Sequence, residues 1–392
     1  MLEEYMLDIG YSDEQINIIK NIYPTFKYST STTLYNIKSL YNFFRRNGLS
    51  NSEFIYVTMT SPSIISESIE NIKLKVLELS TFGFNKIDAF NIIKNYPYIL
   101  EISNQRIKNK LDKLHELGFL KESIIYIMSE NSSLFGIESG SLKKRFQLFI
   151  DFGYSEKETV SIISTIPKLF DCSSSIIQKK FDEFKNMGFK PNEIIKITYI
   201  LPELFIGSVN VINDKFNDLV EFGYSELDIT NIIKKIPIIL KDYYLDNITV
   251  KLNCLTELGF NNDEIILITC NNPYILLYPE EAIIERFNNL LFFDFSIESI
   301  RKMIINLPIL FGYNINTVKE RISYYDEIGL KNLITINSSI LLFPCELIKR
   351  RYDFLSKTIS IDDNNYKYLF LNDIEFYKKF KISKTDLMKD VK

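Results

Sequence analysis

Eight basic residues recur along the chain at intervals of 35 or 36 positions. They are Lys75, Lys110, Arg145, Lys180, Lys215, Lys251, Arg286 and Arg321. A regular row of cations suits the binding of phosphate groups, because it can follow a negatively charged backbone. Such contacts position a nucleic acid without reading its sequence. We call these residues the basic column and take them as the candidate nucleic-acid-binding site.

The basic column also has a structural explanation. On a helical wheel its members lie at the border of the apolar stripe, so their stems can pack on the core while the charged heads reach solvent. Acidic residues three positions later, Glu78, Glu183 and Asp218, could pair with three members, and five members lack such a neighbour. We favour contact with a nucleic-acid backbone, which the basic clusters at residues 143–145, 179–180 and 349–351 could widen.

Residues suited to catalysis or metal binding are scarce. His115 is the only histidine, and no nucleophile signature surrounds it. The four cysteines, Cys172, Cys254, Cys270 and Cys345, are too far apart for a metal clip or a disulfide scaffold, which favours a reducing compartment. The sequence has no P-loop, dinucleotide-binding, H-E-x-x-H or EF-hand pattern. We therefore expect no active site, no cofactor and no metal.

The composition excludes some classes of protein. Of 392 residues, 46% are apolar and 24% are charged, which predicts a folded chain. There are 46 basic and 50 acidic residues, so the net charge of −4 is unlike that of a simple nucleic-acid binder. Any basic binding surface must therefore be local.

The sequence shows no address for secretion or for an organelle. Its acidic first ten residues lack the basic and apolar regions of a signal peptide and the arginines of a transit peptide. Apolar runs stay far below the ~20 residues that cross a bilayer. We expect a monomer with no membrane contact, in the cytoplasm or on the nucleoid.

Two sequence markers define a repeat that must position the basic column. The first is a glycine, or once an aspartate, followed by an aromatic residue or leucine: Gly10, Gly48, Gly83, Gly118, Gly153, Gly188, Gly223, Gly259, Asp294 and Gly329. The second follows 14 positions later: Pro24, Pro62, Pro97, Ser132, Pro167, Pro202, Pro237, Pro273 and Pro308. In the tenth repeat, only nine residues separate Gly329 from Ser338, so it is a degenerate end repeat. The basic column stands eight residues before eight consecutive markers.

The markers predict the same local structure in each repeat, which we call a module. Gly153 suits the left-handed position that ends a helix, and Tyr154 supplies the apolar contact after it. Ser155 and Glu158 form a capping box that starts the first helix, as do the pairs Ser225/Asp228, Asn261/Glu264, Asn85/Asp88 and Ser50/Glu53. Pro167 ends that helix. A second helix with Ile177, Phe181, Phe184 and Met187 on one face then runs to Gly188.

Such modules must stack to bury their apolar stripes. We therefore predict an all-α solenoid of about ten modules of ~35 residues, with residues 1–355 as the solenoid domain. Residues 356–392 lack the markers and suit a capping helix or a partly ordered tail.

In these residues the chain resembles the mitochondrial transcription termination factor (mTERF) family, whose repeats combine Leu-Gly-Phe-Ser, a capped helix, Pro-x-Leu-Leu and a second helix. The matching residues are 257–260 with 272–276, and 222–225 with 236–240. The recurring Pro-x-Leu-Phe argues against pentatricopeptide repeats, which have a similar period.

The resemblance implies a curved superhelix that binds double-stranded DNA or RNA along its concave face. It also implies a role in transcription, such as its termination or initiation, in RNA metabolism or in ribosome biogenesis. By resemblance alone, an organelle is the alternative location. The acidic balance leaves open a second function, that of an α-solenoid scaffold for a protein partner. A third alternative is a host-interaction or defence protein built on the same repeats.

Overall fold

The computed structural model describes residues 2–22, 31–207, 209–241, 244, 246–359, 361 and 365–388. In this part of the chain all regular elements are helices, which confirms the all-α repeat fold. The helices form two compact units, Met1–Val209 and Asn210–Lys392. Pro24 lies outside the described residues. Each unit is described by itself.

Unit 1 begins with the helices α1 (Leu2–Asp8) and α2 (Asp13–Ile22). Its second helices are α3 (Ser31–Arg46), α5 (Ile69–Thr81), α7 (Asn104–Glu116), α9 (Ser139–Phe152) and α11 (Ser174–Asn186). Its other first helices are α4 (Asn51–Thr60), α6 (Lys86–Asn95), α8 (Lys121–Glu130), α10 (Glu156–Thr165) and α12 (Pro191–Ile200). Short 3-10 helices follow them: η2 (Pro62–Ser66), η3 (Pro97–Leu100), η4 (Ser132–Phe135), η5 (Pro167–Phe170) and η6 (Pro202–Phe205).

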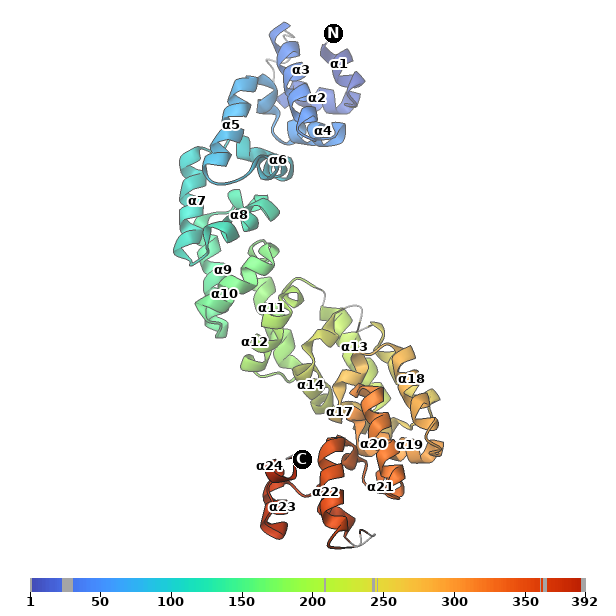
Figure 1. Ribbon diagram of the computed structural model, residues 1–392. Coiled ribbons are helices and arrows are strands. Elements are labelled where there is room, and N and C mark those ends of the chain that lie inside the picture. Colours follow the sequence, from blue (N-terminus) through green and yellow to red (C-terminus); the bar gives the residue numbers. More distant parts are fainter. Residues whose placement is uncertain are drawn as a thin grey trace. The chain divides into compact units, whose positions relative to one another are not determined.

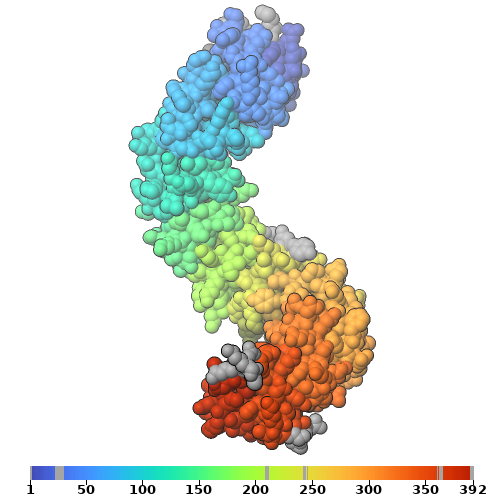
Figure 2. All heavy atoms as spheres, in the orientation of Figure 1, coloured from blue at the N-terminus to red at the C-terminus, as the bar shows by residue number. Residues whose placement is uncertain are grey.

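Within unit 1, first helices pack on first helices and second helices on second helices. Helix α6 contacts α4 and α8, and α8 contacts α10, while α5 contacts α3 and α11 contacts α9. Figure 1 shows α5 and α7 on one side of the unit and α6 and α8 on the other. In Figure 2 the modules follow one another along this unit in sequence order, as in an array whose modules contact only their neighbours.

Unit 2 continues the same order of elements. Its second helices are α13 (Val209–Phe222), α16 (Ile248–Glu257), α18 (Glu280–Leu291), α20 (Ile315–Glu327) and α22 (Cys345–Ser356). Its first helices are α14 (Glu226–Lys235), α17 (Asn262–Asn271), α19 (Ile297–Asn306) and the short α21 (Asn332–Ile336). The 3-10 helices are η7 (Pro237–Leu240), η8 (Pro273–Leu277), η9 (Pro308–Gly312) and η10 (Ser338–Leu342). After α22 come η11 (Tyr366–Phe370), α23 (Asp373–Phe380) and α24 (Lys384–Leu387).

The helix ends form as the sequence predicts. All five expected capping boxes are present. At Gly153, with φ of 107°, the Tyr154 amide donates to the Phe149 carbonyl at 3.1 Å, which completes a Schellman motif. Asp294 replaces the glycine in the ninth module and adopts the same left-handed region, with φ of 59°. The prolines start 3-10 helices whose apolar residues, such as Leu169 and Phe170, are buried.

Neighbouring modules are also joined by buried hydroxyl pairs. Tyr154 hydrogen-bonds Thr198, Tyr11 hydrogen-bonds Thr58, and Tyr224 lies 2.6 Å from the Thr269 hydroxyl. In each pair the tyrosine follows the glycine of one module, and the threonine lies four residues before the proline of the next. Where Phe or Leu follows the glycine, the equivalent partner is apolar and both residues are buried: Leu49 and Ile93, Phe84 and Met128, Phe119 and Ile163, Phe260 and Ile304.

Candidate nucleic-acid interface

Members of the basic column lie in the second helices of consecutive modules, as expected, and many of their charged heads point toward the next module. Lys75 Nζ donates to the Ile102 carbonyl at 2.6 Å, and Lys251 Nζ donates to the Tyr278 carbonyl at 2.9 Å. Lys180 donates to the Gly207 carbonyl. Arg286 and Arg321 donate through Nη1 to the Phe311 and Leu341 carbonyls.

The acceptors share one place in the fold. Each carbonyl lies within two residues of the end of the 3-10 helix in the next module. The last carbonyls of a helix have no partner within it and carry partial negative charge, so a cation there is both donor and counter-charge. The basic column therefore links each second helix to the following 3-10 helix.

The remaining three members differ in detail. Lys110 is buried, and burial followed by the nearby charge of Arg106 lowers its pKa to about 8. Arg145 is half-buried, and its Nη1 has no hydrogen-bond partner among the described residues. Lys215 pairs with Asp218 at 3.2 Å, while residue 242, the position equivalent to the other acceptors, lies outside the described residues.

The expectation that the heads reach solvent is wrong for three members. Lys75, Lys110 and Lys251 are buried, with 9%, 7% and 3% of their surface exposed. Burial is also the main cause that lowers the pKa of Lys75, Lys180 and Lys251. The helical wheel predicts correctly that these residues lie at the edge of the apolar stripe. In the structure the next module covers that edge, so the side chains are buried.

The expected acidic neighbours pair only in part with the basic column. Glu78 lies 3.7 Å from Lys75, and Asp218 pairs with Lys215, but Glu183 lies 3.8 Å from Lys179, which is outside the column. The carbonyl contacts therefore explain the recurrence of the column better than these ion pairs do.

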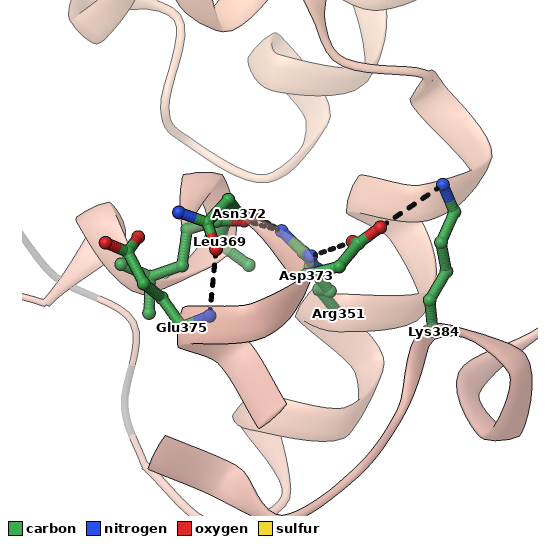
Figure 3. Close-up of polar contacts among 7 residues, drawn as sticks. Arg351, Leu369, Asn372, Asp373, Glu375 and Lys384 are labelled. Atoms are coloured by element: carbon green, nitrogen blue, oxygen red, sulfur yellow. Dashed lines mark hydrogen bonds and ion pairs between the residues drawn. The ribbon is translucent and has the colours of Figure 1, made fainter. Parts of the chain in front are cut away.

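Sequence reasoning missed a ninth member, Arg351 in α22. Its side chain is 1% exposed. It donates to the carbonyls of Leu369 at 2.8 Å and Leu371 at 2.6 Å, and to Asp373 Oδ1 at 2.8 Å, as Figure 3 shows in part. Lys384 approaches the other Asp373 oxygen at 3.6 Å. The signal was present in the cluster at residues 349–351, but the shortened tenth module moves this residue to 30 positions after Arg321.

The histidine and the cysteines do not form a catalytic or metal-binding cluster among the described residues. His115 is exposed, and its Nδ1 lies 3.2 Å from the Phe119 carbonyl. Cys172, Cys254, Cys270 and Cys345 are free thiols. Among the described residues, no three His, Cys, Asp or Glu side chains gather as a metal site would need. In the same part of the chain, no helix combines the length and apolarity that a membrane span needs.

The order of elements defines a class, the α-helical repeat proteins built of helix, 3-10 turn and helix. Residues 4–221 and 208–336 match the sequence model of the mTERF family. The chain belongs to the mTERF family, which confirms the resemblance, and the proteins of this family are non-enzymatic nucleic-acid-binding repeat proteins. The comparison with curated proteins gives no match.

Proposed function

We propose that this chain binds double-stranded DNA or RNA through the phosphate backbone and regulates transcription or RNA metabolism without chemistry of its own. The proposal depends on the net charge of the second helices of unit 1, in a chain that belongs to the mTERF family. Helices α3, α5, α7, α9 and α11 hold 15 basic and 7 acidic residues, a net charge of +8. An acidic protein that binds a polyanion needs such a local basic surface.

Only the less buried members of the basic column are proposed as direct phosphate contacts. Arg145, Lys180, Lys215, Arg286 and Arg321 are all half-buried. A guanidinium has five N–H donors, so Arg286 and Arg321 keep donors beyond the one at the carbonyl. Lys75, Lys110 and Lys251 act instead by fixing how one module stacks on the next.

Membership of the mTERF family also bears on the cellular location. Proteins of this family are usually organellar, so an organelle stands beside the cytoplasm and the nucleoid as the proposed compartment.

The test is binding of the purified chain to labelled duplex DNA, single-stranded DNA and RNA over a salt series. We expect tight binding at low salt to at least one of them, weakening steeply as salt rises, because bound phosphates release counterions. The three ligands identify the preferred nucleic acid. A folded chain that binds none of them at low salt would contradict the proposal.

A protein partner is the second candidate, favoured by an apolar row in unit 2. The residue after the proline is exposed in three successive 3-10 helices: Ile238 at 37%, Tyr274 at 53% and Ile309 at 45%. Tyr274 and Ile309 also line one open pocket with Tyr278 and Tyr313. If no nucleic acid binds, substituting Tyr274 and Ile309 by Ser should remove the protein that copurifies with the wild-type chain.

A further inference from the structure

A second row of lysines lies on the outside of unit 1. Its four members stand ten residues before Gly48, Gly83, Gly118 and Gly153, at intervals of 35 positions. They are Lys38, Lys73, Lys108 and Lys143, on α3, α5, α7 and α9. All four are exposed. We call them the outer lysines.

The outer lysines face away from the basic column. Each of Lys73, Lys108 and Lys143 stands two residues before a member of the basic column on the same helix. Residues two apart are separated by ~200° around the helix axis, so they do not share a face. Lys75 and Lys110 turn inward at this register, so Lys73 and Lys108 remain in solvent. Figure 1 shows α5, α7 and α9 following one another along unit 1, and each of these helices carries one outer lysine.

The outer lysines have no packing role that would explain their recurrence. Among the described residues, Lys73, Lys108 and Lys143 form no hydrogen bond and no ion pair. Lys38 lies over the ring of Tyr5, with Nζ 4.9 Å from its centroid. This differs from the basic column, where Lys75 and Lys180 have carbonyl acceptors. Recurring cations without internal partners are available to an external anion.

The charge around the outer lysines favours a polyanion on this side. The second helices of unit 1 carry +8, whereas its first helices α4, α6, α8, α10 and α12 carry 5 basic and 7 acidic residues, a net charge of −2. The next four modules hold other residues ten before their markers, namely Gln178 in unit 1 and Asn213, Thr249 and Ile284 in unit 2. Four consecutive modules with a lysine at this position thus occur in unit 1, and lysine returns at this position in unit 2 at Lys319 and, two residues before Arg351, at Lys349.

We propose that the outer lysines are the main phosphate contacts of this protein, an inference that rests on the proposed function and assigns its site. Neighbouring modules are offset by about 10 Å, as packed helices are. Four lysines then span about 30 Å, or ~9 base pairs at 3.4 Å each. The exposed Lys144 and Lys179 widen the row. Lysine contacts of this kind give affinity for the backbone without reading bases.

Two variants of the full chain test the assignment. The first replaces Lys38, Lys73, Lys108 and Lys143 by Gln. The matched control replaces four exposed lysines of the first helices by Gln, namely Lys86, Lys121, Lys157 and Lys196. Both variants lose four charges on exposed positions of unit 1, so circular dichroism should show wild-type helix content. Binding to duplex DNA, single-stranded DNA and RNA is then measured between 50 and 300 mM salt, where salt dependence counts phosphate contacts.

The plot of log K against log salt has a negative slope. In the outer variant this slope should become shallower by about 0.7 to 0.9 for each lysine, or ~3 in all. Its affinity at the lowest salt should fall by at least tenfold. The control should change the slope by less than one. Equal slopes for the outer variant and the wild type, or an equal loss in the control, would overturn the assignment while wild-type binding upholds the proposed function. A wild type that binds none of the three ligands overturns both.

Discussion

The second helices of the two units make the same kind of internal carbonyl contact, but they differ in net charge. In unit 1, α3, α5, α7, α9 and α11 carry a net charge of +8, leaving aside the short acidic α1. In unit 2, α13, α16, α18, α20 and α22 hold 8 basic and 12 acidic residues, a net charge of −4. Both units nevertheless contain members of the basic column bound to carbonyls, such as Lys75 in unit 1 and Lys251 in unit 2.

This difference separates packing from binding. A feature that recurs in both units, whatever their outer charge, has its reason in the stacking of modules, and the carbonyl contacts of the basic column are of this kind. A feature that several modules lack is not needed for stacking, and the outer lysines are of this kind, because Asn213, Thr249 and Ile284 replace lysine in unit 2. Comparing modules along the chain therefore distinguishes cations that stabilise stacking from cations that are available to bind a ligand.

The largest effect is expected at Arg351 in unit 2. Arg351→Met removes a buried guanidinium and leaves the Leu369 and Leu371 carbonyls and Asp373 without its donors. We expect the free energy of unfolding to fall by about 3 kcal/mol, as for other buried charged networks. Urea denaturation measures it. The control Arg350→Met disrupts a contact with Glu346 at a partly exposed position and should cost below ~1 kcal/mol. Equal losses in the two variants would show that Arg351 does not hold η11 and α23.

An intermediate effect is expected for the same substitution in both units. Lys75→Met and Lys251→Met each leave one carbonyl, of Ile102 or Tyr278, without a donor. Each should lower the free energy of unfolding by ~1 to 2 kcal/mol. Neither should change the salt dependence of nucleic-acid binding, since neither ammonium group is exposed. A stable Lys75→Met protein with weakened binding would show that Lys75 contacts phosphate as well.

A smaller effect is expected from the hydroxyl pairs. Tyr154→Phe and Thr198→Val in unit 1 should show a coupling energy of about 1 kcal/mol in a double-mutant cycle. Tyr224→Phe and Thr269→Val should show the same coupling in unit 2, because both pairs are buried alike. Additive effects within a pair would mean that its hydrogen bond contributes nothing to stacking.

A further effect, absent at neutral pH, is a dependence of stability on pH. Burial lowers the pKa of Lys110 to about 8, against ~10.4 in an unfolded chain. Between these values the unfolded chain binds more protons than the folded one, so the contribution of Lys110 to stability rises with pH. The stability of the wild type relative to Lys110→Met should therefore increase from pH 7 to pH 9.5 in urea titrations. Lys251→Met should show the same trend, since burial also lowers the pKa of Lys251. A difference that stays flat with pH would contradict the burial of either ammonium group.

The fold could be predicted from the sequence because its signals are local. Glycine, proline and the capping boxes each act within a few residues, so Gly153, Ser155 and Pro167 fix their helix ends without knowledge of the neighbouring module. The direction of the charged heads could not be predicted in this way. It depends on carbonyls 18 to 27 positions ahead, such as that of Ile102 for Lys75, whose position is set by stacking.

Two parts of the candidate site were within reach of the sequence but were missed. Arg351 fell outside the 35-residue interval because α21 has only five residues. The outer lysines keep that interval, yet without a structure they look like a solvated helix face. What distinguishes them is exposure in four consecutive modules, whereas the equivalent positions of the next four modules hold Gln178, Asn213, Thr249 and Ile284.

The hydroxyl pairs bear on how such a chain can gain or lose modules during evolution. Recombination that deletes the stretch from Gly48 to Gly83 keeps the reading frame and the period, but it brings Tyr11 opposite Ile93 in place of Thr58. The stranded hydroxyl would cost about 1 to 3 kcal/mol. Duplicating a module between two phenylalanine positions, such as Phe84 and Phe119, carries no such cost. Modules that look interchangeable in their glycines and prolines therefore have preferred neighbours, and rearrangement is easiest where no tyrosine is involved.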